Sequence, residues 1–331
     1  MKIIVAQKQM NLPRLIVVAL SAIVALSGNV LSVKAAEVRS PNKTFADWCR
    51  QRASLSPQAK HTVDVLLDEA RTTDCDEADR KLSLLTQLTL EFTKITDIKL
   101  LASLTNLTKL ELNYHHKISD IKPLESLTNL TWLSLRGTRI SDIKPLASLT
   151  NLTYLYLDNN KISDIKPLAS LTNLDYLKLE NNQISDIKPL ASLTNLTGLN
   201  LEFNRISDIK PLASLTNLTW LFLSDNAIAD IKPLASLTNL TWLVLSDNAI
   251  ADIKPLASLT NLTWLVLSDN AIGDIKPLAS LTNLTGIHLS GNAIGDLKPL
   301  ASLTNLTVLG LSGNPIAPKT CPLKPEFICQ W

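Results

Sequence analysis

Apolar and polar positions recur along this chain with a fixed period. The stretch LTNLTWLVLSDNAIADIKPLAS (237–258) is preceded and followed, 22 residues away on each side, by a copy that differs at one position. The same frame runs through eleven units from about Leu82 to Ile316, with one extra residue between Asn113 and His116. A period of this length predicts a solenoid built from stacked turns.

Each unit combines one alternating stretch with a set of aliphatic positions. Residues 242–246 alternate outward and inward with period two, which predicts a short strand. The segment D-I-K-P-L-A-S predicts a short helical turn on the opposite side, because proline suits its first position. Seven aliphatic positions would face the interior: Leu237, Leu240, Leu243, Leu245, Ile250, Ile253 and Leu256. A single unit cannot cover these side chains, so we expect neighbouring units to stabilise one another.

An asparagine stands where the chain leaves the strand in eight units, from Asn160 to Asn314. An interior amide can bond the backbone of its own and adjacent turns, so we predict a structural role for this position. Thr93, His115 and Thr138 replace the asparagine in the first three units, where we expect a less regular turn. The pair His115-His116 falls at the inserted residue and predicts an exposed bulge.

The pattern L-x-x-L-x-L-x-x-N-x-I-x-D-I-x-P-L, matched eleven times, resembles the 22-residue leucine-rich repeats of bacterial internalin-like proteins. The resemblance implies an α/β fold, a right-handed leucine-rich-repeat solenoid. Its parallel strands would line the concave face, its short 3₁₀ turns the convex face, and a helical cap its N-terminal end. The regulatory subunit of a eukaryotic protein phosphatase shares this repeat, but that role conflicts with the export segment predicted below.

The N-terminal residues predict export. Three basic residues precede the apolar run 15–26, and Val33-Lys34-Ala35 fits the small-x-small pattern before a cleavage point. We therefore expect a signal peptide at 1–36, with an uncleaved membrane anchor as the alternative. The apolar core is a dozen residues long, short of the roughly 20 that a membrane span needs.

The remaining flanks predict caps at both ends of the solenoid (82–316). Residues 37–81 predict a helical N-terminal cap, in which Ser56 and Pro57 begin a helix that ends near Arg71. Its apolar face would consist of Ala59, Val63, Leu66, Leu67 and Ala70. Residues 317–331 predict a C-terminal cap, and we expect its three prolines and Cys-x₇-Cys loop to prevent another strand or helical turn.

The four cysteines restrict their own pairing. Eleven stacked strands at about 4.8 Å separate the two ends by roughly 50 Å, whereas a disulfide needs Cα atoms within about 7 Å. The pairs that remain are Cys49–Cys75 and Cys321–Cys329. Both suit an oxidising compartment, so we expect a secreted, periplasmic or cell-envelope protein. No His or second Cys pair stands near either couple, and we predict neither a metal nor a cofactor.

Composition and charge exclude several classes of partner. The chain of 331 residues is 46% hydrophobic and 19% charged, as expected for a folded protein, and its formal net charge is +2. Such a balance provides no global field toward nucleic acid or a membrane surface, so we expect no nucleic-acid partner. We also expect no stable membrane insertion once the signal peptide is removed.

The outward-facing strand positions are where the repeat varies, and they carry most of the aromatic residues. We predict a partner-binding concave face formed by Trp132, Tyr154, Tyr156, Tyr176, Trp220, Phe222, Trp242 and Trp264, with an acidic margin of Asp158, Glu180 and Glu202. Aromatic side chains give large contact area at low entropic cost and dominate binding hot spots. The alternative is that repeats 215–280 keep their tryptophans only because they are recent duplicates.

We therefore predict a monomeric, non-catalytic module that binds a protein or peptide with basic groups at its rim. The four histidines have no spacing that suggests a triad or a metal site, and no Gly-rich phosphate loop is present, so we do not expect an enzyme. One alternative is a structural cell-envelope protein that associates with itself through the aromatic face. A second is carbohydrate binding on the same face.

Overall fold

The computed structural model describes residues 43–331. The predicted signal peptide at 1–36, and the first residues of the predicted N-terminal cap, lie outside the described residues. None of the helices in the described part is long and apolar enough to span a lipid bilayer.

Three α-helices precede the repeats: α1 (Phe45–Arg50), α2 (Pro57–Ala70) and α3 (Cys75–Ser83), with a 3₁₀ turn, η1 (Arg52–Ser54), between the first two. The Ser56 side chain caps α2 and Pro57 is its first residue, which confirms the predicted start. All five residues of the predicted apolar face of α2 are buried. Thr62 Oγ1 on α2 donates to the carbonyl of Asp97 in the first repeat at 2.7 Å. The helices thus cover the first turn of the solenoid.

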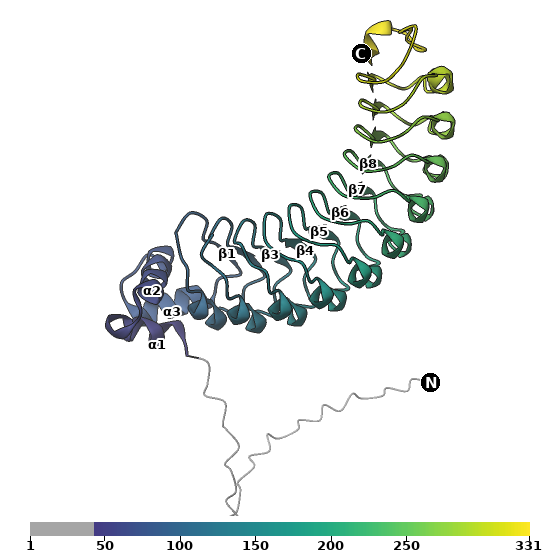
Figure 1. Cartoon of the computed structure of the whole chain (residues 1–331). Helices are drawn as coiled ribbons and strands as arrows, with labels where there is room; N and C mark the ends of the chain where they lie inside the picture. Colours follow the sequence, from purple (N-terminus) through teal and green to yellow (C-terminus); the bar gives the residue numbers. More distant parts are fainter. Residues whose placement is uncertain (1–42) are drawn as a thin grey trace, which may run out of the picture. The chain divides into compact units, whose positions relative to one another are not determined.

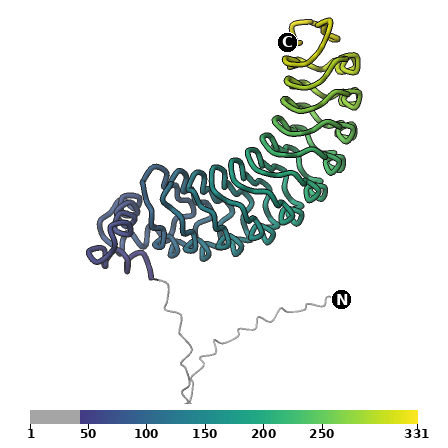
Figure 2. Tube along the Cα trace, viewed as in Figure 1, coloured from purple at the N-terminus to yellow at the C-terminus, as the bar shows by residue number. Residues whose placement is uncertain are grey.

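The repeats form one twelve-stranded parallel sheet in sequence order. The strands are β1 (Gln87–Thr89), β2 (Lys109–Glu111), β3 (Trp132–Ser134), β4 (Tyr154–Tyr156), β5 (Tyr176–Lys178), β6 (Gly198–Asn200), β7 (Trp220–Phe222), β8 (Trp242–Val244), β9 (Trp264–Val266), β10 (Gly286–His288), β11 (Val308–Gly310) and β12 (Cys329–Gln330). The strands line the inner side of the curved repeat region (Figure 1), and the Cα trace shows one turn of similar size per repeat (Figure 2).

The outer side of the curve consists of one 3₁₀ turn in each of the first ten repeats. These are η2 (Lys99–Ser103), η3 (Lys122–Ser126), η4 (Lys144–Ser148), η5 (Lys166–Ser170), η6 (Lys188–Ser192), η7 (Lys210–Ser214), η8 (Lys232–Ser236), η9 (Lys254–Ser258), η10 (Lys276–Ser280) and η11 (Lys298–Ser302). An aspartate starts each turn: Asp120 Oδ1, for example, accepts from the backbone N–H of Lys122 at 2.9 Å. Prolines at the first positions lose no hydrogen bond.

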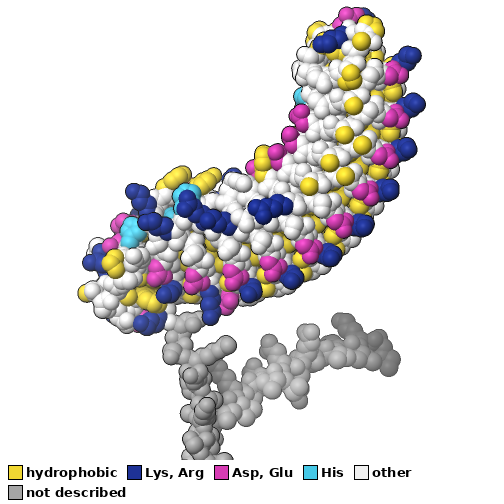
Figure 3. Space-filling model, in the orientation of Figure 1, with side chains coloured by type: hydrophobic (Ala, Val, Ile, Leu, Met, Phe, Trp, Pro, Cys, Tyr) yellow, Lys and Arg dark blue, Asp and Glu magenta, His cyan; other side chains and the backbone are white. Residues whose placement is uncertain are grey.

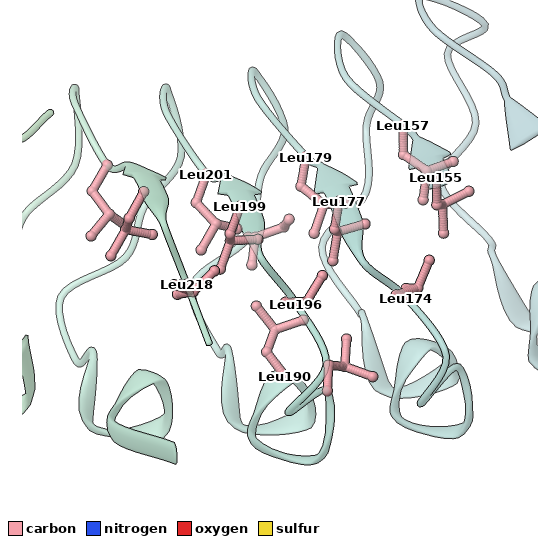
Figure 4. Close-up of a cluster of buried hydrophobic side chains, with 14 of the residues drawn as sticks. Leu155, Leu157, Leu174, Leu177, Leu179, Leu190, Leu196, Leu199, Leu201 and Leu218 are labelled. Carbon is pink, nitrogen blue, oxygen red and sulfur yellow. The ribbon is translucent and has the colours of Figure 1, made fainter. Parts of the chain in front are cut away.

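Aliphatic side chains fill the space between strands and turns as one continuous column. Each of the seven positions predicted from residues 237–258 is at most 1% exposed. Figure 4 shows leucines of neighbouring turns, such as Leu177, Leu199 and Leu155, packed side by side beneath the strands. Stacking therefore buries aliphatic side chains that an isolated turn would expose to water.

The interior asparagines connect successive turns, as predicted. Asn248 Nδ2 donates to the carbonyls of Leu245 in its own turn and Leu223 in the preceding one, at 3.2 and 3.0 Å. Its Oδ1 accepts from the N–H of Ile228 at 3.0 Å. One side chain thus satisfies backbone groups in two turns that burial would otherwise leave unpaired.

The first three turns keep part of this arrangement with other side chains. Thr93 and Thr138 donate to the carbonyls of Leu90 and Leu135, at 2.8 and 3.1 Å. The predicted exposed bulge is wrong for His115, which is 3% exposed, with Nε2 2.6 Å from the Leu90 carbonyl. The interior position imposes burial on whichever residue occupies it, so only His116 is exposed.

Two disulfides close the ends of the described region. Cys49–Cys75 joins α1 to the start of α3, and Cys321–Cys329 closes the C-terminal tail, with Cα separations of 5.6 and 5.9 Å. The expectation that this tail holds no further strand or turn is wrong. A 3₁₀ turn, η12 (Glu326–Ile328), leads into β12, which pairs with β11. The prolines lie before these elements, so the open edge of β11 still finds a partner.

Candidate functional site

The parallel register brings the outward-facing aromatic residues into one strip. Residues of consecutive strands that face each other include Trp132 and Tyr154, Tyr154 and Tyr176, and Trp220 and Trp242. Ring centroids of neighbours along the strip lie 4.3–6.3 Å apart without a break from Trp132 on β3 to His288 on β10. We call this surface the aromatic strip: Trp132, Tyr154, Tyr156, Tyr176, Trp220, Phe222, Trp242, Trp264 and His288.

Two glycines keep the strip continuous. A Cβ atom on Gly198 would lie 1.7 Å from Trp220 Cζ2, so the indole lies flat over this glycine and reaches Tyr176, 4.3 Å away between centroids. Trp264 covers Gly286 in the same way and reaches His288. Sequence reasoning did not assign these glycines to the site. The signal was available, because each interrupts the aromatic column directly beside a tryptophan.

The strip is less exposed than the sequence alone predicts. Trp242 is 47% exposed, whereas the other aromatic residues of the strip are half-buried because their rings pack against one another. Packed rings lose little freedom when a partner binds, which favours a preorganised contact surface. Trp242 is therefore the aromatic side chain of the strip with the most area left to contact a partner.

The acidic margin differs from its prediction at Asp158. This residue is 1% exposed, and its Oδ2 lies 2.8 Å from Arg136 Nε, so the carboxylate is compensated from the preceding turn. Glu180 and Glu202 are half-buried, and each accepts from Asn200 Nδ2, at 3.3 and 3.1 Å. The accessible acidic margin consists of these two glutamates rather than all three carboxylates.

Burial changes the protonation of the polar groups around the strip. Burial, followed by the neighbouring Tyr176 and Tyr154, raises the pKa of Tyr156 to about 12, so its hydroxyl stays neutral. Burial also raises the pKa of Glu202 above its ordinary value, although hydrogen bonds from Asn200 and Ser224 oppose the shift. A cationic group placed beside Glu202 would favour its charged form.

Cations already lie on some of the rings. Lys109 Nζ is 4.8 Å from the Trp132 ring centroid, and Lys178 Nζ is 5.7 Å from that of Tyr176. Within residues 43–331, the buried Trp132 Nε1 has no hydrogen-bond acceptor. The N-terminal half of the strip therefore carries positive charge from lysine side chains. In the C-terminal half, Val244 and Val266 flank Trp242 and Trp264 instead.

The described part of the chain contains no group of three His, Cys, Asp or Glu side chains that could hold a metal ion. The strip instead offers an extended row of π faces and aliphatic edges along eight strands. Such a surface suits contact with an extended segment or a protein face.

Comparison with known proteins identifies the family. The model for "Leucine Rich repeats (2 copies)" matches residues 83–126, 128–170, 172–214, 216–258, 238–280, 260–302 and 282–324. An internalin (inlF) from Listeria monocytogenes is 34% identical and has a TM-score of 0.64, with 80% of this chain and 94% of that chain covered. The chain is an internalin-like leucine-rich-repeat protein.

Two further structures resemble this internalin-like chain. Internalin C2 (inlC2) from Listeria monocytogenes is 35% identical with a TM-score of 0.54, over 70% of this chain and 92% of that one. The ectodomain of the receptor kinase GASSHO1/SCHENGEN3 from Arabidopsis thaliana, in complex with CASPARIAN STRIP INTEGRITY FACTOR 2, is 24% identical with a TM-score of 0.63. It covers 72% of this chain and 31% of that one, and shows the fold alone. None of the curated proteins matches the sequence significantly.

Leucine-rich-repeat proteins are in general protein-binding, and internalin-like relatives are typically non-enzymatic binding proteins that are secreted or lie at the surface. The general role of these families is binding, which agrees with a binding role for this internalin-like protein.

Proposed function

We propose that this protein is an exported, non-catalytic binding module whose aromatic strip contacts a protein or peptide ligand. The observation that carries the proposal is the unbroken contact of aromatic rings from Trp132 to His288 along the strands. A monomeric protein seldom leaves such a surface open without a contact function. Export is supported by the signal-peptide pattern and by two disulfides that suit an oxidising compartment.

The geometry suggests how the ligand is recognised. Trp242 offers the largest free ring area, and the valines beside it give an apolar patch that excludes water from the contact. Glu180 and Glu202 follow β5 and β6, beside the strip, and a basic group of the ligand would pair with them. The ligand would thus place an apolar side chain near β8 and β9 and a cationic group near β5 and β6.

Random-peptide display against the folded protein tests the proposal. We expect enriched peptides to bind Trp242→Ala about tenfold or more weakly, because a central aromatic anchor contributes at least 1–2 kcal/mol. Trp331→Ala is the matched control, since this tryptophan is also partly exposed but lies after the last strand. Equal loss in both variants, or unchanged binding to Trp242→Ala, would contradict the proposal.

Light scattering over a concentration series separates this role from self-association through the strip. A ligand-binding module stays monomeric as its concentration rises. Growth of the wild-type particle that Trp242→Ala abolishes would support the structural role instead.

A further inference from the structure

A second surface lies beside the aromatic strip, along the loops that follow the strands. One position of this loop is basic in five of the first six turns, namely at Lys94, Lys117, Arg139, Lys161 and Arg205, with Gln183 in the fifth. All five basic side chains are exposed. No carboxylate in the described structure lies within ion-pairing distance of any of them. We call this row, together with the loop residue of left-handed φ two positions before it (three positions in the second turn, because of the inserted residue), the exit edge.

The residues of left-handed φ that precede the cations add aromatic rings and amides. Phe92 and Tyr114 stack with their ring centroids 6.2 Å apart, and Phe92 is 77% exposed. Asn159 and Asn181 follow, joined by a hydrogen bond of 2.9 Å from Asn181 Nδ2 to Asn159 Oδ1. Phe203 ends the series and is also exposed.

The three aromatic residues occupy a backbone position that disfavours them. Phe92, Tyr114 and Phe203 have φ angles of 61°, 63° and 53°, in the left-handed region. Glycine fills the same position in three other turns, at Gly137, Gly291 and Gly313. A bulky residue there costs about 1–3 kcal/mol of strain, and such strain is concentrated at functional sites. These rings are exposed rather than buried in the core, so core packing does not explain their presence.

The N-terminal end of the exit edge is hollowed. An open hollow of about 390 Å³ is lined by the Phe92 and Tyr114 rings and by Lys94, His116 and Lys117. Beyond the sixth turn the edge changes sign, because Asp225, Asp247 and Asp269 replace the aromatic and amide residues. Figure 3 shows basic side chains along the rim of the N-terminal half and acidic ones along the inner edge past the bend.

We propose that the exit edge from the first to the sixth turn binds an acidic polysaccharide laid along the solenoid. The row of cations, one per turn, would pair with anionic groups that recur along a linear polymer. The side-chain amides would bond its hydroxyls, and the exposed rings at the two ends would stack against sugar faces. Glu180 and Glu202 precede the edge, are half-buried and accept from Asn200, whereas the exposed Asp247 and Asp269 lie on the edge itself. These aspartates would repel the polymer and so limit the site to the N-terminal half.

An acidic peptide fits this edge less well. Between Tyr114 and Phe203 the edge offers Gly137, Asn159 and Asn181 and no apolar side chain on which a peptide could anchor. The proposed site is also separate from the aromatic strip, so each can fail without the other.

Binding of a heparin oligosaccharide and of polygalacturonate, measured by calorimetry on the folded protein, tests the proposal. The variant Lys94→Gln/Lys117→Gln/Arg139→Gln/Lys161→Gln should bind both at least about tenfold more weakly, because four charge-assisted contacts are lost. The matched control is Lys166→Gln/Lys188→Gln/Lys210→Gln/Lys232→Gln, which removes four exposed charges from the convex face. We expect this control to bind like the wild type.

Three outcomes would overturn the proposal: no binding of either polymer, equal loss in both quadruple variants, or equally tight binding of poly-glutamate. Equally tight binding of poly-glutamate would show that the edge binds polyanions by charge alone, or that its ligand is a peptide. A further variant, Phe92→Gly, relieves the left-handed strain and should weaken polysaccharide binding while the protein remains folded by circular dichroism. Trp242→Ala should leave polysaccharide binding unchanged, which distinguishes this site from the aromatic strip.

Discussion

At the scale of single residues, the absence of a side chain shapes the aromatic strip as much as the rings do. Gly198 and Gly286 give Trp220 and Trp264 room to lie flat against the sheet. A larger residue would tilt each indole outward, which at Gly198 would separate Trp220 from Tyr176 and at Gly286 would separate Trp264 from His288. The contact surface therefore depends on two positions that cannot themselves contribute binding energy.

Gly198→Ala tests this dependence. The new Cβ would overlap the Trp220 indole, so we expect near-ultraviolet circular dichroism to change and stability to fall by about 1–3 kcal/mol. Gly295→Ala is the control, because a Cβ there would meet no atom within 4 Å. Unchanged tryptophan signals in Gly198→Ala would show that the indole is not held against the glycine.

His115 gives the chain a pH-dependent turn. Burial lowers the pKa of His115 from 6.5, even though the Leu90 carbonyl and Glu91 favour the charged form. The unfolded chain then binds the proton more tightly than the folded one, so stability should fall as pH drops below about 6.5. His115→Asn, which restores the usual residue of the repeat, should remove this part of the pH dependence in urea unfolding. His116→Asn should retain it, and a loss in both variants would contradict the assignment to His115.

At the scale of one turn, the interior asparagine matters more than its outer counterpart. Asn248 bonds the carbonyls of Leu223 and Leu245 and the N–H of Ile228, whereas the exposed Asn239 makes one bond, to the carbonyl of Thr216. Two of the groups bonded to Asn248 belong to the preceding turn. Loss of the interior amide therefore weakens the contact between two turns.

Urea unfolding of Asn248→Ala and Asn239→Ala measures this difference. We expect Asn248→Ala to cost about 2–5 kcal/mol, because it leaves several buried backbone groups unpaired. Asn239→Ala should cost under about 1 kcal/mol, since water replaces the lost partner. Similar losses in the two variants would show that the interior amide has no special role.

The elements that the sequence predicts best are those fixed by period alone. The strand register, the aliphatic column and the 3₁₀ turns follow from one 22-residue frame, and the two disulfides follow from the length of the stack. The strand β12 was missed because it lies outside the frame and exists only by pairing with β11. The burial of Asp158 depends on Arg136 in the adjacent turn, a contact that comparison of aligned columns could have suggested.

At the scale of the whole repeat region, burial and the proposed recognition are divided between two sides of each turn. The aliphatic column and the asparagines hold the stack together, which leaves the outward strand positions free to vary. The strands place those positions side by side across turns, so aromatic residues from seven of the eight strands β3–β10 become a continuous surface. Recognition by such a surface needs a ligand long enough to contact several turns.

Hydroxyl-radical footprinting of the tryptophans, with and without a peptide selected by display, tests the central claim most directly. We predict that Trp242 and Trp264 are protected from oxidation on binding, while Trp48 and Trp331, which lie outside the strip, react as before. Protection of Trp48 or Trp331 with Trp242 left fully reactive would contradict the claim that the aromatic strip binds the ligand.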